Sequence, residues 1–373
     1  MKTRTVVIGC LGGGFVLLLL AGVAVFVGVK YYLMPAMKMP PELERPGILA
    51  GEKFLQKDLF VDVASIGKVT DILYQPSEKP AIGIAGVRGT VWVTPAGDVK
   101  STVPIFASVS NVQFVDIDGD GTYELLNRGG LGWQQASLMD DDGSLLWTSD
   151  AGAGVDDMAA GDLDGDGTAE FVVGYNGSDG IHQLDKDGKL KWKQNDFNVW
   201  HVEVTDTDGD GTNEIVHSNA AGQITIRDAA GAILRQNRPE PYLSRFTLAH
   251  WPTKTDPQYL LYAQNARIWL YDFDAKTIAD FDAPYVGLIG SAGETKGTPV
   301  TLDAGQPPYF AIVVEFAIWP RAVLSLYDNG SKLVYQEVLE APCAALAALP
   351  NADGEGESLY VGTEGNVWKY TWP

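Results

Sequence analysis

The 373-residue sequence predicts an all-β fold built from a repeated unit of about 45 residues, and three repeated patterns predict it. The first is an acidic segment that occurs three times and begins at Asp116, Asp162 and Asp206, with spacings of 46 and 44 residues. The second is a series of turns between apolar runs, centred on Gly97, Gly143, Gly188, Gly231, Ala275 and Gly330. The third marks the start of another strand in several units, at Gly89, Gly222, Ala266 and Gly365. Apolar runs separated by Asp-Gly or Asn-Gly indicate hairpins, so the repeat is predicted to be a four-stranded sheet.

Residues 6–29 precede the repeats and contain no charged side chain. A helix of that length, at about 1.5 Å per residue, is long enough to cross a hydrocarbon core of ~30 Å. We expect an uncleaved signal anchor, with residues 1–5 as a cytoplasmic tail because Lys2 and Arg4 favour the inner side. The expectation is a single-pass membrane protein whose remaining residues lie in the periplasm or outside the cell. A cleaved signal peptide is the alternative, although its apolar region is usually shorter.

Residues 30–56 contain four prolines, at positions 35, 40, 41 and 46. Proline at this density disfavours both helix and strand, so we expect a semi-extended stalk that precedes the repeats.

Residues 57–373 are predicted to form a seven-bladed β-propeller, in which four-stranded sheets follow one another around a ring. Six units contain a complete hairpin at the second pattern, whereas the seventh ends at Pro373 one strand short. An unpaired edge would favour aggregation, so we expect the apolar run Leu59–Val63 to supply the missing strand and close the ring. Six or eight blades are the alternatives, because the sixth unit is irregular.

Each acidic segment reads Asp-x-Asp-Gly-Asp-Gly-Thr-x-Glu, which places four carboxylates within nine residues. Such groups repel one another unless a cation lies between them, and Ca²⁺ takes six to eight oxygen ligands. An EF-hand would need Glu at position twelve, where this sequence has Asn127, Val173 and His217. A Glu at position nine followed by an apolar run instead indicates a calcium loop between two strands. The predicted ligands of three Ca²⁺ ions, with each Thr acting through its main-chain carbonyl, are Asp116, Asp118, Asp120, Thr122, Glu124, Asp162, Asp164, Asp166, Thr168, Glu170, Asp206, Asp208, Asp210, Thr212 and Glu214.

These segments, recurring at the spacing of blades, resemble the FG-GAP/VCBS repeat family, which includes the calcium-binding propeller of integrin α subunits. The resemblance covers residues 57–373 in architecture, but the motif covers only the second, third and fourth units. It implies that the twelve acids named above bind metal. The seventh unit departs from the motif, because the segment that begins at Asn351 has Leu359 at position nine.

The remaining residues give no sign of catalytic chemistry. A formal charge of −21 argues against nucleic acid as a partner, since phosphate contacts need clustered Lys and Arg. Outside residues 6–29 the sequence contains no nucleophile elbow, phosphate loop or dinucleotide fingerprint. Trp147 and Trp192 share one repeat position, which predicts packing between blades, whereas Trp251 and Trp319 lie off the repeat and are candidates for an exposed binding face.

We therefore predict that this protein is not an enzyme. It is expected to be a membrane-anchored, extracytoplasmic calcium-binding propeller that binds or scaffolds a protein or a glycan, a role that would also suit an accessory subunit of a membrane complex. The alternative is a propeller enzyme, such as a polysaccharide lyase or a quinoprotein-type dehydrogenase. Such an enzyme would need acids, bases or cofactor ligands that converge on the central channel.

Overall fold

The computed structural model describes residues 39–105, 111–128, 135–149, 153–243, 245–285, 295–316, 319–343, 345–352 and 354–373. The chain divides into two compact units, residues 1–45 and residues 46–373. The described part of the first unit contains one short 3-10 helix, η2 (Pro41–Leu43). The second unit contains a further short 3-10 helix, η3 (Ala64–Ile66), and the described strands.

The predicted membrane localisation needs correction. Within the described ranges, no helix is long and apolar enough to cross a membrane. The predicted anchor, residues 6–29, lies outside the described residues, as do the predicted tail and residues 30–38 of the predicted stalk.

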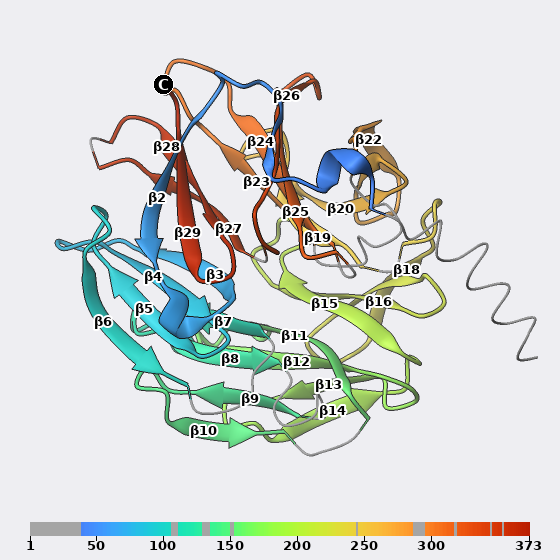
Figure 1. Ribbon diagram of the computed structural model, residues 1–373. Helices are drawn as coiled ribbons and strands as arrows, with labels where there is room; N and C mark the ends of the chain where they lie inside the picture. The colour runs from blue at the N-terminus through green and yellow to red at the C-terminus, as the bar shows by residue number, and fades with distance from the viewer. Residues whose placement is uncertain are drawn as a thin grey trace, which may run out of the picture. The chain divides into compact units, whose positions relative to one another are not determined.

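The described strands of the second unit form seven antiparallel sheets, which we call blades one to seven (Figure 1). Blade one contains β3 (Val69–Gln75), β4 (Ala81–Gly86), β5 (Gly89–Val93) and β6 (Val99–Pro104). Blade two contains β7 (Asn111–Val115), β8 (Glu124–Arg128), β9 (Ala136–Met139) and β10 (Leu145–Thr148). Blade three contains β11 (Val155–Gly161), β12 (Glu170–Tyr175), β13 (Ile181–Leu184) and β14 (Leu190–Gln194). Blade four contains β15 (Val199–Thr205), β16 (Glu214–Asn219), β17 (Ile224–Arg227) and β18 (Ile233–Asn237).

The last three blades follow the same plan, and the N-terminal strands complete two of them. Blade five contains β19 (Thr247–His250), β20 (Gln258–Gln264), β21 (Arg267–Tyr271) and β22 (Thr277–Asp282). Blade six contains β23 (Thr295–Val300), β24 (Tyr309–Glu315), β25 (Ala322–Tyr327) and β26 (Leu333–Val338), with β1 (Gly47–Ala50) paired to β26. Blade seven contains β27 (Ala345–Pro350), β28 (Glu357–Gly362) and β29 (Asn366–Thr371), with β2 (Gln56–Asp62) as its fourth strand.

The predicted closure by the N-terminal strand is confirmed. In β2, Leu59 pairs with Trp368 of β29, and Figure 1 shows the blue β2 beside the red β29. The edge that the end of the chain leaves open is therefore paired by residues that precede blade one. Residues 47–50, placed in the stalk by the sequence prediction, are strand β1 on the outer edge of blade six.

The hydrophobic core is divided among the contacts between blades. Each of seven clusters of buried residues in the described structure joins two consecutive blades. The last cluster joins blade seven to blade one, through residues such as Tyr360 and Val367 on one side and Ile82 and Ile84 on the other. Because blade one is buried against blade seven in this way, the ring is closed, and the seven-bladed propeller is confirmed.

The predicted turns connect the third and fourth strands of the blades, and they position the repeated tryptophans. In blade three the Gly188 N–H donates to the carbonyl oxygen of Asp185 (2.9 Å), with φ of +77° at the glycine. A Cβ at Gly188 would lie 2.7 Å from the ring of Trp147 in blade two, and the indole N–H of Trp147 donates to the Lys186 carbonyl (3.0 Å). Trp192 makes the equivalent contact with blade four. These tryptophans therefore pack between blades, as predicted.

Two of the tryptophans proposed for an exposed binding face are instead buried. Trp251 is 7% exposed and packs against Phe281 and Phe310, and Trp319 is 8% exposed and lies beside Phe316. Their departure from the repeat therefore reflects local packing in blades five and six, so neither offers an exposed contact.

Candidate functional site

The three acidic segments occupy equivalent places in blades two, three and four. We call residues 116–123, 162–169 and 206–213 acidic loops one, two and three; each connects the first strand of its blade to the second. The Glu at position nine is in each case the first residue of the second strand. It pairs with the last residue of the first strand, which is Val115, Gly161 or Thr205. Because every loop follows a first strand, the three loops lie at the same end of the ring.

The first Asp of each loop fixes the path of the backbone. In acidic loop one, Asp116 Oδ1 accepts the N–H of Gly119 (2.8 Å) and Oδ2 accepts the N–H of Gly121 (3.0 Å). The two glycines have φ of +74° and +84°, a region that residues with a Cβ rarely adopt. The same pair of hydrogen bonds forms in loop two, to Asp162, and in loop three, to Asp206. Position five accepts the N–H of the following Thr in all three loops.

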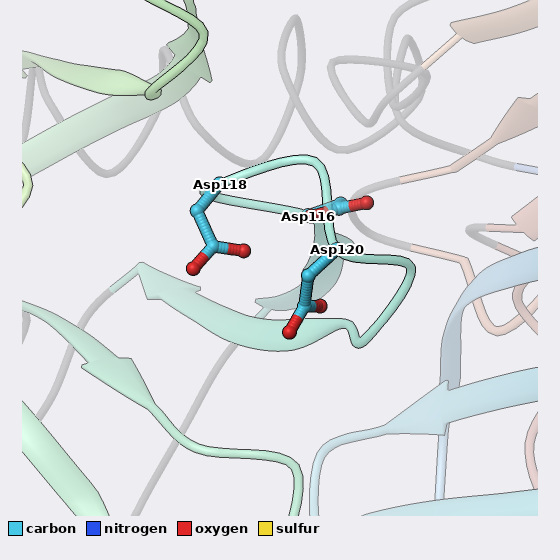
Figure 2. A group of neighbouring side chains, drawn as sticks. All are labelled: Asp116, Asp118 and Asp120. Carbon is cyan, nitrogen blue, oxygen red and sulfur yellow. The ribbon is translucent and has the colours of Figure 1, made fainter.

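This backbone path gathers the predicted ligand oxygens. Asp116, Asp118 and Asp120 each place a carboxylate oxygen within 4.8 Å of the other two, and Asp206, Asp208 and Asp210 do the same. Figure 2 shows the carboxylates of Asp118 and Asp120 on the same side of loop one. In loop two the equivalent group is Asp162, Asp164 and Glu170, without Asp166. The main-chain carbonyls of Thr122, Thr168 and Thr212 stay predicted ligands.

The Glu at position nine brings a buried carboxylate to each loop. Glu124 is 9% exposed, and its Oε2 accepts the N–H of Ile117 (3.2 Å). Burial raises the pKa of the Glu124 carboxyl, and the charges of Asp118 and Asp116 raise it further. Glu124 is not among the three carboxylates that gather in loop one, but a buried carboxylate near like charges is unfavourable unless a cation or a proton accompanies it. The geometry of acidic loop one therefore fits a bound cation.

Hydrogen bonds also link the acidic loops to one another. The N–H of Ala169 in loop two donates to the carbonyl oxygen of Ile117 in loop one (2.8 Å). The side-chain amide of Asn213 in loop three donates to the carbonyl oxygen of Asp162 in loop two (2.8 Å). These contacts therefore tie the loops of consecutive blades together.

The innermost strands contain a second group of charged residues, centred on Asp157, an acid that the sequence reasoning did not single out. His201 of β15 contacts Asp157 of β11 through Nδ1 and Glu203 through Nε2 (3.2 Å). Burial alone would lower the pKa of His201, but the two carboxylates outweigh it and raise that pKa to about 9. Asp157 also accepts the N–H of Val202 in blade four (3.2 Å). β15 is an edge strand of its sheet, and Asp157 therefore joins blade three to blade four by accepting an N–H from this edge strand.

A similar contact joins blades one and two, where Asp71 accepts the N–H of Phe114 (3.0 Å). The signal that could have found Asp71 and Asp157 is an acid within an apolar first strand, away from any loop.

His217 of β16, in contrast, is fully buried and lies 3.3 Å from both Arg227 and Asp196. Burial lowers the pKa of His217 to about 4, so it is neutral near pH 7. This supports a structural role for His217.

Comparisons with known proteins agree on the fold. No family model matches the chain, and no curated protein matches it in sequence. A structure of BBS1N in complex with ARL6DN is similar over 86% of this chain and 97% of that chain, with 14% identity and a TM-score of 0.56. The Pan2 WD40 domain of Neurospora crassa is similar over 85% of this chain and 95% of its own, with 11% identity and a TM-score of 0.51. Raptor of Chaetomium thermophilum matches 86% of this chain with 30% of its own length, at 13% identity and a TM-score of 0.56.

At such low identities these similarities show the architecture alone. The conclusion that the sequence, the structure and the comparisons share is that this chain is a seven-bladed β-propeller.

Proposed function

We propose that this protein is a protein-binding propeller in which calcium orders blades two to four. The observation that carries the proposal is the repetition of one loop geometry in three consecutive blades, with the same two hydrogen bonds to the first Asp and the same buried Glu. Solvated Asp-Gly turns would not need the same hydrogen bonds in every copy. A loop that binds a calcium ion must place its ligands in the same positions each time. The motif also supports membership of the FG-GAP/VCBS family.

The role of calcium would be structural. An ion bound only by the folded protein stabilises it by about 2.7 kcal/mol when its free concentration is 100 times Kd. Since the acidic loops are hydrogen bonded to one another, each bound ion would also order the contact between two blades.

The protein partner is supported by the fold. The structure of BBS1N, whose fold is similar to that of this chain, is of a complex with a second protein, ARL6DN. An enzyme is less well supported, because His201 and Asp157 are already engaged with each other and with Glu203 and a backbone N–H of the next blade. These contacts link blades three and four, which gives His201 and Asp157 a structural role in the fold.

The calcium proposal is tested by thermal unfolding of the full chain after treatment with EDTA and again after calcium is restored. We expect the midpoint to fall and then to recover, and magnesium should restore it less well because it requires a smaller octahedral site. An unchanged midpoint would exclude structural calcium.

The partner proposal is tested by affinity capture with the purified chain in calcium and in EDTA. The Asp118→Ala/Asp208→Ala variant is the control, since it removes one predicted ligand from each of loops one and three. A protein retained only in calcium and lost with the variant would support the proposal. Selective binding to glycans, with no protein retained, would overturn it.

A further inference from the structure

The fourth strands of blades two, three and four contain an extra residue at the same place. In blade three, Leu184 pairs with Leu190 and Gln183 pairs with Trp192, which leaves Lys191 as the unpaired residue of a bulge. The pairings of blade two leave Leu146 at this position, and those of blade four leave Leu234. Lys191 therefore takes a place that leucine holds in the two neighbouring blades.

The Lys191 side chain reaches the acidic loop of its own blade. Its Nζ lies 3.1 Å from Asp164 Oδ2 and 3.1 Å from Glu170 Oε1, at positions three and nine of loop two. Both acids are predicted metal ligands, so the ammonium lies where a metal ion would contact them. Glu170 is buried and Lys191 is 35% exposed, which makes this a partly shielded ion pair.

Loops one and three differ in this respect. Across the part of the chain that the structure describes, no Lys or Arg forms an ion pair with Glu124 or Glu214. Leu146 and Leu234 carry no charge that could replace one. In blade four, the cationic side chain of Arg235 contacts Asp274 and the Thr207 hydroxyl.

Blade seven supplies an independent example of the same arrangement. Glu357 is the first residue of β28 and pairs with Pro350, the last residue of the first strand, just as Glu170 pairs with Gly161 in blade three. Its Oε2 accepts the N–H of Thr301 (2.9 Å), and its Oε1 binds the ammonium of Lys254. Blade seven lacks the acidic motif, so a lysine accompanies this carboxylate where a metal site is not expected.

We propose that the Lys191 ammonium is a tethered cation that takes the metal position of acidic loop two, so that only loops one and three depend on calcium. This rests on the proposed calcium function and refines it. An ion entering loop two would have to break two charge-assisted hydrogen bonds and return the ammonium to water, whereas loops one and three present their carboxylates with no cationic competitor. A tethered cation also needs no free calcium to be present.

The test is calorimetric titration of the calcium-stripped full chain. We expect wild type to bind two ions, with any third at least about tenfold weaker because two ion pairs oppose it. Lys191→Leu, which copies blades two and four, should bind three ions of similar affinity. Lys193→Leu removes a charge from the same strand without touching the loop and should still bind two. Adding Asp164→Ala to Lys191→Leu should return the count to two and assign the third ion to loop two.

The reciprocal variant transfers the lysine. Leu146→Lys should weaken the ion of loop one by at least about tenfold and reduce the tight sites from two to one. Three equal sites in wild type, or two in both wild type and Lys191→Leu, would overturn this inference. The absence of calcium binding in wild type and Lys191→Leu alike would instead overturn the proposed function on which it rests.

Discussion

Blades two to four and blades five to seven have the same strand order, yet they hold the end of the ring that carries the acidic loops in different ways. In the former, the turn from the first to the second strand gathers carboxylates. In blade five the same turn is held by Thr253, whose N–H and hydroxyl both donate to Asp256 (2.9 and 2.6 Å). The fold therefore does not require acidic loops, and the proposed calcium sites would account for their presence in three consecutive blades.

Blades six and seven meet at a buried ionic contact of a different kind. Glu337 is 5% exposed, and it pairs with Lys57 (2.6 Å) and accepts the hydroxyls of Tyr335 (2.7 Å) and Tyr370 (2.8 Å). All of its partners are part of the chain. The contact between blades six and seven is thus formed entirely by side chains of the protein, including Lys57 of the closing strand β2, whereas blades two and four are expected to depend on an ion bound from solution.

Calcium removal should produce the largest difference between blades two to four and blades five to seven. We expect EDTA to lower the free energy of unfolding by about 2.7 kcal/mol for each site that was filled at 100 times its Kd. Hydrogen exchange with mass spectrometry should show faster exchange in β7–β10 and β15–β18, the strands of the two blades whose loops are proposed to depend on calcium, and little change in β19–β29. Uniformly faster exchange would show that the ring responds as one unit and would contradict the comparison.

Breaking the contact between blades six and seven should have the next largest effect. Glu337→Leu leaves Lys57 and two hydroxyls without their acceptor, and we expect a loss of about 3 kcal/mol in urea unfolding. Glu337→Gln keeps an acceptor for the hydroxyls and should lose less. The loss should be the same with and without calcium, and a calcium-dependent loss would show that the halves are coupled.

A smaller effect should follow pH through His201. The folded pKa of His201 is raised to about 9 from a usual value near 6.5, so the stability it contributes is complete below pH 6.5. That stability is lost as the pH rises to about 9, and we expect a decrease on the order of 2 kcal/mol. His201→Gln should flatten this alkaline limb in unfolding curves measured with calcium in excess.

The matched control is His217, whose pKa is lowered to about 4. Its contribution is present above pH 6.5 and is lost as the pH falls towards 4, so His217→Asn should alter the acid limb and leave the alkaline limb unchanged. An alkaline limb that persists in His201→Gln would assign the titration to other groups.

The smallest effect is expected at an exposed contact between blades four and five. Arg235 occupies the position of Trp147 and Trp192 but forms an ion pair with Asp274, whose side chain is 70% exposed (3.4 Å). Asp274→Asn should cost less than about 0.5 kcal/mol by thermal unfolding, because solvent screens such a pair. A larger loss would show that Arg235 holds these blades as the tryptophans hold theirs.

Much of the fold could be predicted from the sequence because a propeller repeats local structure. Turn residues such as Gly143 and Gly188 recur at the length of a blade, and a chain one strand short at its end implied a partner strand before blade one. The buried Trp251 and Trp319 show the limit of this reasoning. A residue that breaks a repeat signals either an exposed site or local packing, and burial alone distinguishes them.

The acidic loops, too, could be predicted from the sequence only in part. The seven blades and the loops in which carboxylates gather were predicted from spacing and from the turns that glycine permits. Only the tertiary structure placed Lys191 against Asp164 and Glu170, Lys254 against Glu357, and Asp157 against His201. Those contacts join residues on different strands or blades, and the direction in which a bulge residue points depends on the register of strands that no local pattern specifies.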